Sequence, residues 1–144
     1  MNDAARVRFV HLGEDPVSTA QMAAAVADDH CGAVVTFDGV VRDHDGGRPV
    51  RSLDYSAHPQ ALAELERVAQ EVAARHPEVR LALAHRLGSL RIGETALACA
   101  VSAAHRREAF EACEDAVTTL KRTVPIWKHQ VFTDGTEEWV GALD

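Results

Sequence analysis

The sequence lacks the features that identify several large classes of protein. It has no apolar run close to the roughly 20 residues that cross a bilayer, so we expect no membrane segment. The polar N-terminus, Met1 to Arg8, is not followed by a signal-type apolar stretch, which favours a cytoplasmic location. The phosphate-binding motifs GxxxxGK(S/T) and GxGxxG and the hydrolase motif GxSxG are also missing.

Cysteine and histidine are present without the spacings that build disulfides or bind metals. The three cysteines form no CxxC pair and their number is odd, so we predict reduced, mostly buried thiols. The eight histidines contain no HExxH and no paired zinc spacing, from which we predict neither a metal site nor a cofactor. Surface or capping roles are predicted for His11, His30, His44, His58, His76 and His85.

The net charge limits the kinds of partner. A formal charge of −7 argues against a general nucleic-acid-binding surface. An anionic small molecule remains a candidate substrate, but the cations that bind it would have to be clustered locally. The placement of lysine and arginine is therefore informative.

Length and composition predict one globular domain over residues 1–144, since 47% of the residues are hydrophobic and the chain is of ordinary domain size. Helical and strand patterns alternate, and several connections are too short for a crossover. We therefore expect an α/β or α+β fold with much antiparallel pairing. The predicted strands are 6–12, 32–42, 51–56, 79–87, 95–103, 126–132 and 137–141, the helices 18–29, 59–75 and 105–122, with turns at 88–93 and 133–135 and a mobile loop at 43–49.

The helix at 105–122 has the clearest periodicity. Its apolar stripe is predicted to contain Phe110, Cys113, Val117 and Leu120. Pro125 cannot continue the helix, so the strand at 126–132 follows directly. Alternation along this strand predicts that Ile126, Lys128 and Gln130 share one face.

Lysine is used at only two positions, although arginine is used at 13. Lys121 and Lys128 flank the sequence VPIW, and a reversal from helix to strand there would bring both ammonium groups to one pocket. A partly buried lysine can lose its proton, which arginine cannot, so the pair is a candidate for acid, base or nucleophilic chemistry. Chance placement, or complementing the helix C-terminus, would explain Lys121 equally simply.

Basic residues also stand at the start of the predicted helix 105–122, where their charge opposes the helix dipole. A bound oxyanion or phosphate would explain His105, Arg106 and Arg107 there, as would solvated side chains balanced by acidic neighbours. His105 and Lys121 are 16 residues apart, or about 24 Å along a helix. If both serve one substrate, the site must be shared between two subunits, which predicts a dimer.

Arg42 is a further candidate for anion binding. It ends the apolar strand GAVVTFDGVVR and precedes a glycine-rich segment, a position that suits an anion clamp as well as a plain surface arginine.

Five segments together resemble one protein family. GAVVTFDGVVR, HRLGSLRIGE, VSAAHRREAF, LKRTVPIWK and EEWV occur in the order seen in the catalytic subunit of molybdopterin synthase, the MoaE family. The resemblance covers about residues 5 to 141, and the combination of the HRxxAF helix start with LKxxxPIWK is highly specific.

The resemblance implies a fold, a reaction and partners. The fold is an α/β hammerhead-type domain with an additional antiparallel β subdomain. The activity is that of a sulfurtransferase: two sulfurs pass from the C-terminal thiocarboxylate of a small ubiquitin-like carrier to cyclic pyranopterin monophosphate, forming the dithiolene of molybdopterin. Two catalytic subunits form a central homodimer that binds two carriers, giving a heterotetramer.

By motif position, the resemblance implies that Lys121 and Lys128 are catalytic and that Arg42, His105 and Arg106 bind the anionic substrate, with the His-Arg pair acting in the partner subunit's site. The alternative is a non-catalytic module that binds an anion or pterin, or docks a carrier. Two departures from the family pattern are Ser56 to His58, where Glu and an aromatic residue are common, and Gln130, where an acid is common.

Overall fold

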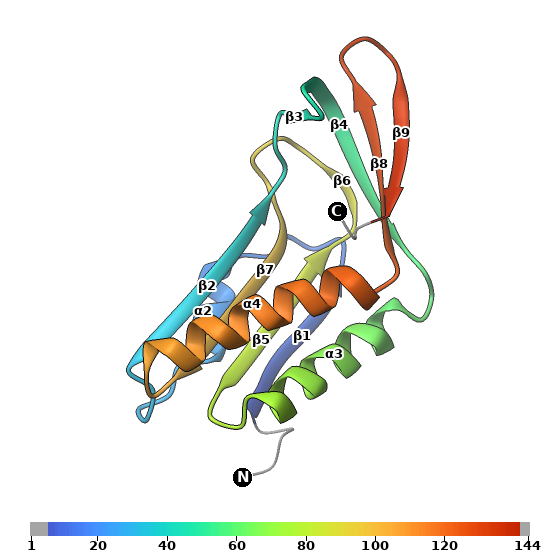
Figure 1. The fold of residues 1–144 in the computed structure, drawn as a ribbon. Coiled ribbons are helices and arrows are strands. Elements are labelled where there is room, and N and C mark those ends of the chain that lie inside the picture. The colour runs from blue at the N-terminus through green and yellow to red at the C-terminus, as the bar shows by residue number, and fades with distance from the viewer. Residues whose placement is uncertain (1–5, 142–144) are drawn as a thin grey trace.

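The computed structural model describes residues 6–141, which form two β-sheets and three helices (Figure 1). The first sheet has the strand order β1-β5-β7-β2, with β1 parallel to β5 and the other pairs antiparallel. The second has the order β3-β4-β8-β9, with β6 paired to β4, and all its pairs are antiparallel. The strands are β1 (Val7–Gly13), β2 (Ala33–Val40), β3 (His44–Asp45), β4 (Arg48–Ala57), β5 (Arg80–Arg86), β6 (Gly88–Leu90), β7 (Thr95–Ala103), β8 (Ile126–Phe132) and β9 (Glu137–Gly141).

The helices cover both faces of the first sheet. The helices α3 (Ala61–Arg75) and α4 (Arg106–Thr123) pack on one face, where side chains such as Leu81 and Leu83 are fully buried. The short helix α2 (Thr19–Ala25) packs on the other face, which is lined by alanines of β5 and β7. The second sheet extends beyond this core at one end (Figure 1).

The predicted α+β class with added antiparallel strands is confirmed, and most predicted elements are present. Ser18 caps α2, because its hydroxyl accepts a hydrogen bond from the Gln21 backbone N–H at 3.1 Å. Val124 is extended before Pro125, so α4 ends where predicted. None of the helices within residues 6–141 is long and apolar enough to cross a membrane.

Three local predictions were wrong. Residues 43–49 are not an irregular loop, because β3 and the start of β4 pair there as a hairpin. The segment at 88–93 contains the short strand β6. Phe110 is 60% exposed, whereas the buried stripe of α4 is made mostly of small side chains: Ala109, Ala112, Cys113, Ala116 and Leu120.

The cysteines agree with the prediction of reduced and mostly buried thiols. Cys99 on β7 and Cys113 on α4 are buried with their Sγ atoms 3.9 Å apart, and Cys31 is partly buried. The 3.9 Å separation is that of two thiols in contact, well beyond a covalent S–S bond.

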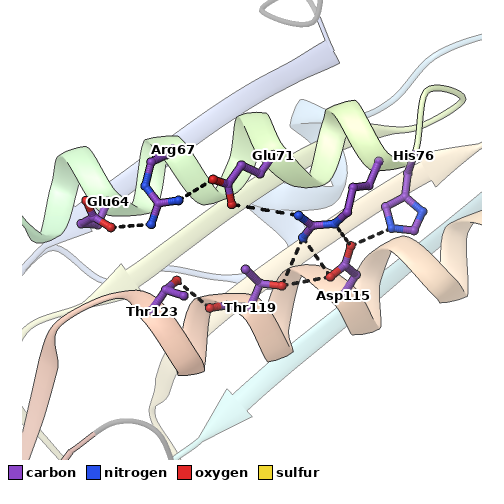
Figure 2. Close-up of polar contacts among 8 residues, drawn as sticks. Glu64, Arg67, Glu71, His76, Asp115, Thr119 and Thr123 are labelled. Atoms are coloured by element: carbon purple, nitrogen blue, oxygen red, sulfur yellow. Dashed lines mark hydrogen bonds and ion pairs between the residues drawn. The ribbon is translucent and has the colours of Figure 1, made fainter.

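A polar network ties α3 to α4 along their outer faces (Figure 2). Arg75 at the end of α3 donates from Nε and a terminal nitrogen to the Asp115 carboxylate, at 2.9 and 3.0 Å. His76 and Thr119 also contact this carboxylate, at 2.8 and 2.9 Å. Partial burial opposes ionisation of Asp115, but the hydrogen bonds from Arg75, His76 and Thr119 outweigh it and lower its pKa to about 2.

We expect Asp115→Ala to destabilise the fold by about 1–3 kcal/mol, because it leaves Arg75 and His76 without their shared acceptor. The stabilisation from ionised Asp115 is present above the ordinary aspartate pKa of 3.8 and is lost as pH falls towards 2. The free energy of unfolding of the variant should therefore depend less on pH over this range than that of the native chain. Urea unfolding across this pH range measures both effects. Glu111→Ala, which breaks an exposed ion pair on the same helix, is the control, with an expected loss of about 0.5 kcal/mol or less. Equal losses in the two variants would contradict the prediction.

Candidate active site

A recess of about 430 Å³ lies where the two sheets meet, between β2, β4, β8 and the C-terminal end of α4. Its inner wall is apolar and includes Phe37, Leu53 and Leu97. The polar side chains that line it are Arg42, His44, Tyr55, His85, Lys121, Lys128 and Gln130. An apolar recess with a few converging polar groups is the usual form of a small-molecule site.

Both lysines line this recess, so the prediction that the helix-to-strand reversal brings them together is confirmed. Lys121 lies in the last turn of α4, and Lys128 pairs with Tyr55 across β8 and β4. Alternation along β8 places Lys128 and Gln130 on the same face of the strand, as predicted. Within the described residues, neither ammonium group forms a hydrogen bond or an ion pair, so both remain available to a ligand.

Arg42 also lines the recess, two residues after the end of β2. Its side chain is 62% exposed, and one terminal nitrogen lies 3.2 Å from an Asp45 oxygen. Three of the five predicted site residues therefore converge on one cavity: Arg42, Lys121 and Lys128.

The other two, His105 and Arg106, do not lie in this recess. They are exposed at the N-terminal end of α4, which is continuous and lies away from the second sheet (Figure 1). His105 occupies the N-cap position in an extended conformation, without a side-chain capping bond. The unbroken helix confirms that His105 and Lys121 of one chain do not meet, and the sharing of a site between two subunits stays a prediction.

His85 is a pocket residue that sequence reasoning missed, since a surface or capping role was predicted for it. It lies on β5, 4% exposed, and its ring meets that of Tyr55 edge-on, with centroids 4.9 Å apart. Its Nδ1–H donates to the Arg86 carbonyl oxygen at 2.8 Å, which leaves Nε2 as the acceptor nitrogen. Burial lowers the pKa of His85 to about 4, with the nearby Lys121 charge acting in the same direction, so the imidazole is neutral at pH 7.

The burial of neutral His85 predicts a specific pH dependence of stability. Because its folded-state pKa lies below the ordinary 6.5, the unfolded chain binds the proton first, and stability falls as pH drops from 6.5 towards 4. This term amounts to at most about 3 kcal/mol. Urea unfolding of the native chain and His85→Gln over this range should give curves that diverge below pH 6.5. Parallel curves would contradict a buried neutral imidazole.

Residues 6–141 contain no cluster of three or more His, Cys, Asp and Glu side chains able to hold a metal ion. The predicted absence of a metal and a cofactor stays a prediction.

Comparison with known proteins bears on what this pocket does. A family model described as MoaE protein matches residues 12–123. The chain belongs to the MoaE family. It is 41% identical over 136 residues to the molybdopterin synthase catalytic subunit of Pyrococcus abyssi, an alignment that spans 94% of this chain and 90% of that one.

Solved structures agree with the MoaE assignment. The crystal structure of molybdopterin synthase from Staphylococcus aureus matches with a TM-score of 0.83 and 34% identity, over 90% of this chain and 95% of that chain. A complex of subunits 1 and 2 of molybdopterin-converting factor from Helicobacter pylori shares the fold, with a TM-score of 0.70 at 21% identity over 91% of this chain and 89% of that one. The predicted family, and with it the function of a molybdopterin synthase catalytic subunit, are confirmed.

Proposed function

We propose that this MoaE family chain is a sulfurtransferase whose active site is the recess containing Lys121 and Lys128. It transfers two sulfurs to cyclic pyranopterin monophosphate, one from the C-terminal thiocarboxylate of each of two small ubiquitin-like carriers, forming the dithiolene of molybdopterin. The main support is that the only two lysines in a chain of 15 basic residues converge on one cavity, with Arg42 at its rim.

Each cation has a separate role in this proposal. Arg42 binds an anionic group of the substrate through charge-assisted hydrogen bonds. Lys121 acts as acid/base or as a transient covalent nucleophile when the thiocarboxylate sulfur attacks. Lys128 orients the substrate or the terminal carboxyl group of the carrier, and both ammonium groups stabilise the oxyanions that form.

The site is completed by a second subunit. His105 and Arg106 are about 24 Å along α4 from Lys121, so they bind the phosphate only in the partner subunit's pocket. The assembly is a central homodimer with two carriers, a heterotetramer. The Helicobacter pylori protein of the same fold forms a complex of subunits 1 and 2, which supports pairing with a second kind of subunit, whereas the homodimer rests on the length of α4. A cytoplasmic location stays a prediction from sequence.

Reconstitution tests the proposal. The purified chain is mixed with a thiocarboxylated carrier and cyclic pyranopterin monophosphate, and dithiolene formation is followed over time. The same carrier with an ordinary carboxylate tail is the control, and it should give no product. Binding of carrier and pterin without turnover would overturn the sulfurtransferase assignment and support a binding or docking module instead.

A further inference from the structure

The β3–β4 hairpin holds an acidic residue in a fixed place at the edge of the pocket. Its loop is the pair Gly46 and Gly47, with φ values of 58° and 77°, so both residues use the left-handed region that a tight two-residue hairpin turn requires. Asp45 directly precedes this turn, and it pairs with Arg48 across the hairpin. The position of the Asp45 backbone is therefore set by the turn.

The Asp45 carboxylate joins two elements of the pocket. One oxygen accepts a hydrogen bond from Nε2 of Gln130 on β8 at 2.6 Å, across 85 positions of sequence. The other accepts from a terminal nitrogen of Arg42, after β2, at 3.2 Å. Gln130 is 3% exposed, so its amide depends on this acceptor in a place where water is scarce.

Asp45 is also close to the lysine side of the pocket. The hydrogen bond from Gln130 is the main cause that lowers the pKa of Asp45, and the charges of Lys128 and Arg42 add to it. Asp45 itself does not line the recess. Its negative charge therefore offsets the charges of Lys128 and Arg42 without occupying the cavity.

We propose that Asp45 is a positioning residue for substrate binding: its carboxylate clamps the β3–β4 hairpin to Gln130 and holds Arg42 over the pocket. The proposal rests on the proposed function, because it assumes that Arg42 binds the substrate anion. An arginine that is largely exposed samples many rotamers, and fixing it beforehand removes part of the ordering cost that substrate binding would otherwise carry. Loss of the clamp should therefore raise KM and leave kcat nearly unchanged.

Three variants distinguish the effect of the Asp45 charge on Arg42 from the effect of its hydrogen bond with Gln130. Asp45→Asn keeps a partner for Gln130 but removes the charge that holds Arg42. Gln130→Glu places two carboxylates where the 2.6 Å contact was, and repulsion should open the hairpin. The double variant Asp45→Asn with Gln130→Glu restores one amide and one carboxylate. Asp43→Asn is the matched control, because Asp43 is an exposed acid of the same segment whose side chain pairs with His44 instead.

We expect KM for cyclic pyranopterin monophosphate to rise about three- to tenfold in Asp45→Asn and further in Gln130→Glu. The double variant should fall back to the KM of Asp45→Asn alone, because the repulsion is relieved while the carboxylate that holds Arg42 is still missing, with kcat within about twofold throughout. An unchanged or lowered KM in Asp45→Asn would overturn the proposal, since it would mean that Asp45 competes with the substrate for Arg42. A double variant as poor as Gln130→Glu would also overturn it.

A second readout does not depend on turnover. The Val50 N–H donates to the Asp43 carbonyl oxygen at 2.8 Å and reports on the hairpin through amide hydrogen exchange. Exchange should be faster in Gln130→Glu, and normal in the double variant and in Asp43→Asn. If the native chain makes no product but this pattern holds, the sulfurtransferase proposal fails and the clamp stands. Unchanged exchange in Gln130→Glu would show that the hairpin is held without Asp45.

Discussion

Lys121→Ala should lower the rate of dithiolene formation by about 10²- to 10⁴-fold, the range expected when a general acid/base is removed. Lys121 lines the recess, and no carboxylate within the described residues pairs with it, so its ammonium group is available to the substrate. Lys121→Arg should not restore activity, because a guanidinium does not give up its proton at working pH. Single-turnover assays with saturating carrier and pterin measure this effect directly.

Arg122→Ala is the matched control for this experiment. Arg122 is exposed in the same last turn of α4, so its removal takes one positive charge from the helix end without changing the pocket. We expect its activity to stay within about threefold of the native chain, in line with the small effect of most surface substitutions. If Lys121→Ala keeps more than a tenth of the native rate while binding carrier normally, Lys121 is not the central catalytic residue.

Mixing two inactive variants should regenerate activity if each site draws residues from two subunits. Lys121→Ala removes the amine of a subunit's own pocket, whereas Arg106→Ala removes the anion contact that it gives to its partner. In a mixed dimer one site then carries both changes and the other carries none. Random reassembly makes half of the dimers mixed, so about a quarter of the native activity should return.

The complementation test depends on subunit exchange, which co-expression of two differently tagged variants provides. Purification through both tags in sequence isolates the mixed dimer, whose expected activity is about half that of the native dimer. A second pair, Lys121→Ala with Lys128→Ala, should not complement, because both lysines line the same pocket. Activity that stays near zero in the Lys121 and Arg106 mixture would show that the site is not shared in this way.

Sequence reasoning succeeded where one face of an element is buried and the other is not. The alternation along β8 placed Lys128 and Gln130 correctly, and Pro125 fixed the end of α4. It failed at His85 because nearly every residue of β5 is buried, so the strand shows no alternation to reveal which side chains face a cavity. No pattern in the sequence marks His85 as a pocket residue.

The other failures have equally local causes. The stripe of α4 was misplaced at Phe110 because size and hydrophobicity were taken as signs of burial, whereas the face packed on the sheet is built from alanines. Strands as short as β3 and β6 are below the length at which alternation can be recognised. The contact between Asp45 and Gln130 joins segments 85 residues apart, and a single sequence carries no signal for such a pair.

Because lysine is scarce in this chain, reagents that modify side-chain amines react only in the pocket. Apart from the α-amino group, Lys121 and Lys128 are the only amines in the chain, and both line the recess. Reductive methylation with carbon-13 formaldehyde would therefore place its side-chain labels in the pocket alone, where their NMR shifts report proton loss and ligand approach. Immobilisation or crosslinking through lysine side chains would, for the same reason, block the pocket, so surface-bound assays of this chain should use affinity-tag attachment.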